Sequence, residues 1–379
     1  MNEDSSLVHF RHSLVDWLSV NLTAEVIEAQ RSSSDGGDDL GVLRSWNARL
    51  ADAGWAAVSW PARFGGRDAT VGQQLVYHEE MTRAGAPGPV NTIGVSNIAP
   101  AIMSLGTDEQ QERFLRPMLR GNEIWCQGMS EPEAGSDLAS LRTAARAEGD
   151  VFVVNGQKTW NSLGQYADWC QLYVRTDPEA PKHKGISCLL VDMKSPGITV
   201  RPLRTMSGDL TFSELYFDDV VVPRSGLLGV LHDGWRVAMT TLSHERAGVA
   251  RLHLDLAERF DRLVEAARRR GPIVDTAHRE ALARVYADIA CLRYATTWEL
   301  AKVGRGAQPS ATMGGLAKLA WAQAGQQLAD LAVNILGADA LLGGPWTKSL
   351  LMAPSYSIAG GTGDINRNVV AEHGLGLPR

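Results

Sequence analysis

The sequence predicts an α+β protein in which a central β domain lies between two helical regions. Three observations support this. Apolar residues recur at three- and four-residue spacing from about residue 5 to 120. Between about 124 and 225 they form short runs rich in β-branched and aromatic residues. After Gly229 the helical spacing returns and continues to the end of the chain.

The first region reads as several amphipathic helices, as the spacing of Leu43, Trp46 and Leu50 illustrates. Glycine, proline and small polar residues interrupt it at 32–38, 64–66 and 86–89. Thr107 offers a hydroxyl cap with Gln110 three residues later, and apolar residues follow. This capping box predicts a helix that starts after Thr107.

The central region reads as antiparallel strands. Its β-rich runs lie at 151–154, 186–191, 198–200 and 215–222. We expect turns at the polar and glycine-containing segments between them, which are 155–156, 196–197 and 207–209.

The last region predicts long amphipathic helices that break at 271–272, 304–309 and 343–345. One stripe of apolar residues passes through Glu245, with Arg246 beside it; its members are Met239, Leu242, Val249, Leu252, Leu256, Phe260 and Leu263. A carboxylate in phase with an apolar face is costly unless it is paired or used in chemistry. Glu245 is therefore either half of a partly buried pair with Arg246 or His244, or a functional carboxylate.

Composition excludes several classes of protein. The 379 residues include 37 Lys and Arg against 43 Asp and Glu, a net charge of −6, so nucleic acid is not an expected partner. No stretch resembles a membrane span or a signal-peptide core. The four cysteines are far apart, which argues against zinc and disulfides. We expect a reduced, cytoplasmic protein.

Four segments carry a family resemblance. Residues 125–137 form a turn-rich loop with hydroxyls at Ser130 and Ser136, and they match the pattern [TS]-E-P-x-A-G-S-D. Residues 155–162 resemble NGxKxW[IT][ST], with Asn161 at the [IT] position; 217–223 resemble the segment that ends the β domain of the family, and 361–367 match GTxxIxR. In this order the segments resemble the FAD-dependent acyl-CoA dehydrogenases over essentially the whole chain.

The resemblance implies both a fold and a reaction. The fold comprises an all-α domain at 1–122, an antiparallel β-barrel or sandwich at 123–228, and a four-helix bundle at 229–379. The reaction is oxidation of an acyl-CoA thioester to the trans-2-enoyl-CoA in lipid metabolism. An electron-transfer flavoprotein is an expected electron acceptor.

The resemblance also assigns FAD contacts. The isoalloxazine would be lined by Gln127, Met129 and Ser130 and covered by Trp160 and Ser162. Contacts to the rest of the cofactor fall on Ser136 (flavin side chain or CoA) and on Thr362 and Asp364 (adenosine diphosphate).

Two departures from the family pattern bear on function. Many members read Tyr-Glu-Gly-Thr, with Glu as the α-proton base, where this chain has Ala359, Gly360, Gly361 and Thr362. Other members place the base in a Glu-Arg pair after the β domain, which Glu245 and Arg246 match. Arg246 would then orient Glu245 or contact CoA, while Gly360 and Gly361 would face the thioester, the Gly360 N–H polarising its oxygen. The small Ala359 and Gly360 predict room for a bulky acyl group.

The second departure concerns an Arg-x-x-Phe-Gly-x6-Gln motif that reaches the FAD of a neighbouring subunit. In the corresponding stretch, residues 268–272, no Phe precedes Gly271, and no Gln occurs seven residues after it. Arg270 is therefore either a remaining FAD contact or one of several basic residues favoured at a helix end.

The resemblance predicts a homodimer or homotetramer, with a heterotetramer containing a paralogue as an alternative. Apolar residues after 310 suggest the interface; they are Leu316, Leu319, Trp321, Leu328, Leu331, Val333, Ile335 and Leu336. Three functions stay open: an acyl-CoA dehydrogenase, a non-catalytic or half-site subunit of one, and a flavoenzyme of the same fold that uses oxygen or a carrier-protein-bound acyl group.

Overall fold

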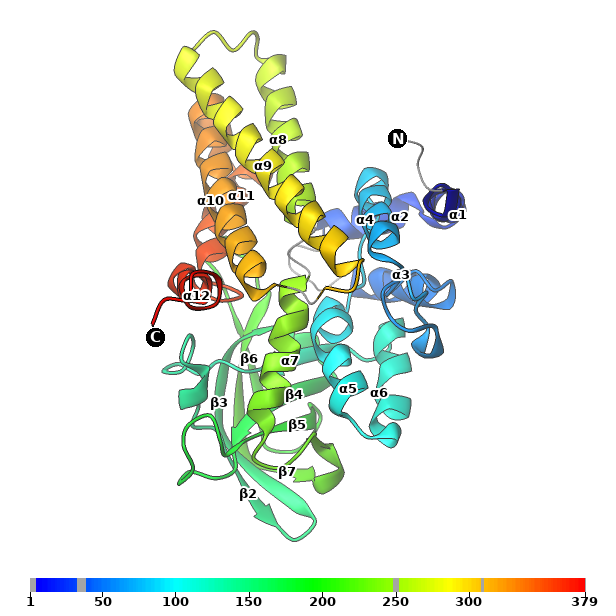
Figure 1. The fold of residues 1–379 in the computed structure, drawn as a ribbon, viewed down its shortest axis with the longest axis vertical. Helices are drawn as coiled ribbons and strands as arrows, with labels where there is room; N and C mark the ends of the chain where they lie inside the picture. Colours follow the sequence, from blue (N-terminus) through cyan, green and yellow to red (C-terminus); the bar gives the residue numbers. More distant parts are fainter. Residues whose placement is uncertain (1–4, 33–38, 248–251, 308–309, 379) are drawn as a thin grey trace. The chain divides into compact units, whose positions relative to one another are not determined.

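The computed structural model describes residues 5–32, 39–247, 252–307 and 310–378. Contacts group the chain into two compact units, Met1–His244 and Glu245–Arg379 (Figure 1). The first unit holds a helical region and the sheet, and the second is helical, which confirms the predicted fold class. No helix in the described ranges combines the length and hydropathy needed to cross a membrane.

The first unit begins with the helices α1 (Ser5–Asn21), α2 (Ala24–Ser32), α3 (Leu40–Asp52), α4 (Val71–Ala84), α5 (Ala99–Leu105) and α6 (Asp108–Arg120). The capping box before α6 is confirmed, because the Thr107 hydroxyl accepts from the Gln110 N–H and the Gln110 side chain accepts from the Thr107 N–H. Gly121 ends α6 in the left-handed conformation.

The sheet contains β1 (Trp125–Gly128), β2 (Ala144–Glu148), β3 (Val151–Ser162), β4 (Trp169–Arg175), β5 (Ile186–Asp192), β6 (Ile198–Leu203), β7 (Phe212–Pro223) and β8 (Leu227–Leu228). Its strand order is β6-β7-β3-β2-β4-β5-β8, and β1 pairs with β4. The pairs are antiparallel except β1–β4 and β2–β4. The four predicted runs are strands, so the antiparallel prediction holds for most of the sheet.

One expected turn is wrong. Asn155 and Gly156 lie inside β3, where the pairing with β7 shifts register between Val154 and Gly156. The backbone there has φ 149°, and a Cβ on Gly156 would lie 2.7 Å from Thr143 Cα. The glycine therefore admits a close neighbour within a bulged strand instead of ending the strand.

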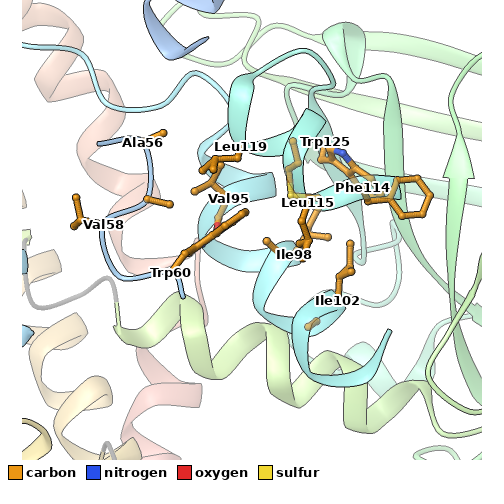
Figure 2. Packing of buried hydrophobic residues seen from close by; sticks show 14 of the residues in the cluster. Ala56, Val58, Trp60, Val95, Ile98, Ile102, Phe114, Leu115, Leu119 and Trp125 are labelled. Atoms are coloured by element: carbon orange, nitrogen blue, oxygen red, sulfur yellow. The ribbon is translucent and has the colours of Figure 1, made fainter. Parts of the chain in front are cut away.

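Both faces of the sheet are covered within the first unit. On β5, Ile186, Cys188 and Leu190 pack into the core formed with the N-terminal helices, whereas Leu189 and Val191 point into a second core inside the sheet. This alternation explains why β5 reads as a continuous apolar run. Figure 2 shows the helical part of the first core, in which the Phe114 and Trp125 rings meet edge to face.

Helix α7 (Gly234–Ala247) follows the sheet, and its Val237 and Ala238 are buried in the first core. The predicted stripe divides between α7 and α8, and Val249 lies outside the described residues. Its last three members are buried in the second unit, but Met239 is 37% exposed.

The second unit contains α8 (Leu252–Arg269), α9 (Thr276–Val303), α10 (Ala311–Leu336), α11 (Pro345–Met352) and α12 (Gly363–Val369). The first three separations fall where breaks were expected, and the separation of α11 from α12 was not expected. Helix α10 is central and contacts the other four. Leu328, Leu331 and Leu336 on α10 are therefore buried within the unit and do not form surplus apolar surface. Leu316 of the same predicted set is 43% exposed, and exposed aromatic side chains lie on α9, at Tyr286, Tyr294 and Trp298.

Candidate functional site

The loop after β1 is joined directly to β3. The Thr159 N–H on β3 donates to the Ser130 carbonyl at 2.9 Å, and Glu131 and Ala134 exchange backbone hydrogen bonds of 3.1 Å. The first and second motifs, about 30 residues apart in the sequence, therefore form one local structure in which Ser130 lies beside the strand that carries Trp160.

Trp160 has an unusual conformation. Its φ is 60°, a left-handed value that is rare for a bulky residue, and the pairing of β3 with β7 shifts register between Lys158 and Asn161. Its side chain is 61% exposed and packs edge to face with Phe212, with ring centroids 5.9 Å apart. Strain of this kind costs about 1–3 kcal/mol and is concentrated at functional sites. An exposed indole on a strained bulge indicates a surface for a flat ligand.

The other predicted contacts in this unit differ in exposure. Met129 is half-buried against the first core, and Ser136 is exposed. Ser130 and Ser162 are half-buried, and their hydroxyls make no hydrogen bond to any described residue. Hydroxyls without a partner beside an exposed indole fit a planar cofactor with a polar edge, such as a flavin.

Gln127 belongs to a polar network that the sequence did not indicate. Its Oε1 accepts from Asn97 Nδ2 and its Nε2 donates to Gln171 Oε1, both at 3.3 Å. Gln171 Nε2 then donates to Thr241 Oγ1 on α7 at 3.2 Å, and the Tyr173 hydroxyl lies 3.2 Å from the same oxygen. Gln127 therefore connects the end of β1 to α7 through buried hydrogen bonds.

A second feature that was not predicted from the sequence is an ion pair beneath the loop that follows β1. Lys158 on β3 has a fully buried side chain, and its Nζ lies 2.8 Å from Glu131 Oε1. Burial lowers the pKa of the Lys158 ammonium to about 8, although Glu131 opposes this effect. Burial acts to raise the pKa of Glu131, but Lys158 and hydrogen bonds from Thr143 and the Arg142 backbone keep it below its usual value. Glu131 lies in the segment 125–137 and Lys158 in the segment 155–162. An acid in one motif and a base in the other are the sequence signal that could have indicated the ion pair.

The lowered pKa of Lys158 predicts a pH dependence of stability. Between pH 8 and its ordinary pKa of 10.5, the unfolded chain keeps a proton on Lys158 that the folded chain has lost. The free energy of unfolding attributable to this residue therefore rises with pH, by on the order of 2–3 kcal/mol. Urea unfolding of the wild type and of Lys158→Met from pH 7.5 to 10.5 measures it. A difference between the two proteins that stays constant or falls over this range contradicts the expectation.

In the second unit, the predicted C-terminal loop is held by its own residues. Gly360 and Gly361 have φ values of 66° and 94°. Thr362 caps α12 by accepting from the Ile365 N–H at 3.2 Å. The buried Asn366 amide donates to the Gly361 and Thr362 carbonyls at 2.9 and 3.0 Å, so the glycine turn has a defined shape.

The remaining predicted contacts are charged residues. Asp364 is 90% exposed and pairs with Arg367 at 2.7 Å. The Arg270 guanidinium donates to the Leu336 carbonyl at the end of α10 and pairs with Asp339 at 2.6 Å. Arg270 thus caps a helix end within its own unit, while leaving its side chain 45% exposed.

Two predicted catalytic residues are only partly described. Glu245 and Arg246 lie in the last turn of α7, and their side chains are outside the described residues.

Family comparisons match the chain along most of its length. Models of the acyl-CoA dehydrogenase N-terminal, middle and C-terminal domains match residues 19–122, 126–220 and 232–375. A relative from Mycobacterium tuberculosis, acyl-CoA dehydrogenase IpdE1, is 37% identical over 98% of this chain and 97% of its own length.

Solved structures agree with this match. A structure titled Tcur3481-Tcur3483 steroid ACAD superposes with a TM-score of 0.88 at 30% identity, covering 100% of this chain and 99% of that one. The ChsE4-ChsE5 complex from Mycobacterium tuberculosis gives 0.86 at 32% identity with the same coverage. The chain therefore belongs to the acyl-CoA dehydrogenase family, whose members are flavin-dependent oxidoreductases.

Proposed function

We propose that this protein uses FAD to oxidise an acyl-CoA thioester to the trans-2-enoyl-CoA. FAD, when bound, supplies the acceptor for the hydride that leaves the β-carbon. The observation that carries the proposal is Trp160, a strained and exposed indole held beside Ser130 in a chain of this family. Gln127, Met129 and Ser130 hold one part of the isoalloxazine, and Trp160 with Ser162 covers another.

The family resemblance assigns contacts to the rest of FAD. Ser136 contacts the flavin side chain or CoA, and Thr362 and Asp364 contact the adenosine diphosphate. The shape of the turn before α12 supports the assignment of Thr362, because it is fixed by Asn366. Arg270 contacts FAD only if the guanidinium exchanges its bonds at the end of α10 for phosphate oxygens.

Proton removal is assigned to the second unit. Glu245 takes the α-proton, and Arg246 orients that carboxylate or contacts CoA. The negative charge that develops on the thioester oxygen needs a hydrogen-bond donor, which the Gly360 backbone N–H supplies beside Gly361. The proposed reaction also requires a site that excludes water around the base.

The substrate is proposed to be a bulky or ring-bearing acyl-CoA. Ala359 and Gly360 replace two large side chains beside the proposed reaction centre. A related solved structure titled steroid ACAD supports a large polycyclic group, since this chain resembles it over its whole length.

The assembly is proposed to be a dimer or tetramer that passes electrons to an electron-transfer flavoprotein. The exposed aromatic residues of α9, at Tyr286, Tyr294 and Trp298, repeat at eight- and four-residue spacing and so share one face. A paralogous partner is favoured by the two-component titles of the related structures and by the altered segment at 268–272.

One experiment tests function and assembly together. The purified chain is examined by light scattering, flavin content is measured per chain, and ring-bearing acyl-CoA thioesters are added without oxygen.

Bleaching of a bound flavin supports the dehydrogenase. One flavin per chain in a homo-oligomer makes a partner unnecessary. Half occupancy or less that a co-expressed paralogue restores favours the half-site subunit. Bleaching only with a carrier-protein-bound acyl group, or turnover only with oxygen, would replace the proposal with that chemistry.

A further inference from the structure

We propose that the buried Lys158–Glu131 ion pair is a positioning element that sets the conformation of the flavin loop, residues 129–131, against β3. The inference rests on the proposed function, because it assigns the loop to the flavin. Lys158 and Glu131 are not among the site residues assigned from the sequence motifs or from the family comparisons.

Lys158 joins β3 to the loop at two points. Its Nζ donates to the Met129 carbonyl at 3.0 Å and to Glu131 Oε1 at 2.8 Å. The side chain of Lys158 is 0% exposed and that of Glu131 is 8% exposed, so water cannot readily replace either bond. An ammonium in this position therefore fixes the residues on both sides of Ser130.

Glu131 extends the connection to the chain that enters β2. Its Oε2 accepts from the Arg142 N–H at 2.7 Å, and its Oε1 accepts from the Thr143 N–H at 2.8 Å. Three donors thus converge on one buried carboxylate. Charged hydrogen bonds of this kind are stronger than neutral ones and define geometry tightly.

Two further features connect the ion pair to Ser130 and Trp160, the residues that are proposed to face the ligand. The Thr159 N–H donates to the Ser130 carbonyl, so the residue that follows Lys158 also holds the loop. Trp160 comes next, on the bulge that begins after Lys158. The ion pair therefore determines how the Ser130 hydroxyl and the Trp160 indole lie relative to each other.

Stability alone does not account for the pair. Burial of two charges is offset only by excellent geometry, and apolar replacements of buried pairs often leave stability unchanged or improved. Arg175 is a further cation that acts against the Lys158 charge. A costly ion pair that hydrogen-bonds to the ligand loop is expected to be kept for geometry.

The test compares Lys158→Met, Glu131→Gln and the double variant with the wild type. The double variant removes both charges and so avoids leaving one of them buried alone. Leu189→Ala on β5 is the matched control, because it creates a cavity in the sheet core and Leu189 is not among the residues that form the loop hydrogen bonds described above. FAD dissociation constant, flavin absorption spectrum, thermal midpoint and amide hydrogen exchange of residues 129–143 are measured in the physiological assembly.

We expect the double variant to bind FAD about 10-fold or more weakly, with a shifted flavin spectrum and faster exchange at residues 129–143. Its thermal midpoint stays at or above that of Leu189→Ala, which keeps the wild-type spectrum and affinity. The inference is overturned if the double variant keeps the wild-type FAD affinity, flavin spectrum and hydrogen exchange. It is also overturned if Leu189→Ala loses as much FAD affinity as the double variant at the same thermal midpoint. A wild-type assembly that binds no flavin instead refutes the proposed function.

Discussion

Glu245→Gln lowers the rate of flavin reduction by an acyl-CoA by about 10²–10⁴-fold, the usual contribution of a general base. The amide has nearly the shape of the carboxylate but cannot accept the α-proton, so flavin content and thioester affinity remain at wild-type values. Anaerobic stopped-flow bleaching measures the rate, and equilibrium titration of the oxidised protein with a product analogue measures binding.

The matched control is Glu265→Gln, an exposed glutamate of α8 that pairs with Arg269, which is expected to leave the rate unchanged. Near wild-type bleaching in Glu245→Gln would remove Glu245 from the mechanism. Adding Gly360→Glu to Glu245→Gln tests whether a carboxylate at the alternative family position reaches the α-carbon. Only a fraction of the rate is expected to return, because Gly360 has φ 66°, which a glutamate adopts with strain.

Ring-bearing acyl-CoA thioesters are expected to exceed butyryl-CoA in kcat/KM by about 10²-fold or more. The space proposed beside Ala359 and Gly360 would be filled poorly by a short chain, which would then lose its near-attack geometry. About four additional buried methylene groups, at about 0.8 kcal/mol each, are enough for this difference. Steady-state kinetics on a panel of straight, branched and ring-bearing thioesters measures it.

Ala359→Phe is the companion variant, because it adds a large side chain at the same turn without placing a substituent on either glycine. We expect it to reduce kcat/KM for the ring-bearing thioesters by about 10-fold and to leave butyryl-CoA little affected. If butyryl-CoA is already the best substrate of the wild type, the assignment of the cavity to a bulky acyl group is wrong.

Much of the architecture could be predicted because it depends on neighbours in the sequence. The capping box at Thr107 and the β-branched runs act within a few residues, and the structure confirms them. Strand β2 was missed because its sequence, Ala144–Glu148, has low β-propensity, and it becomes a strand by pairing with β3. The turn predicted at Gly156 was wrong because it too depends on a distant segment. The close approach of Thr143 explains why a glycine occurs inside this strand, and the local sequence does not show it.

The candidate site divides in the same way. The sequence by itself determined the family and the residue types of the flavin and thioester motifs, among them Ser130, Trp160 and Glu245, because motifs are local patterns. Only the tertiary structure decided that Trp160 is strained and exposed and that Lys158 pairs with Glu131, 27 residues away in the chain. Burial, hydrogen-bond partners and pKa depend on which distant segments meet, and residue spacing along the chain does not contain that information.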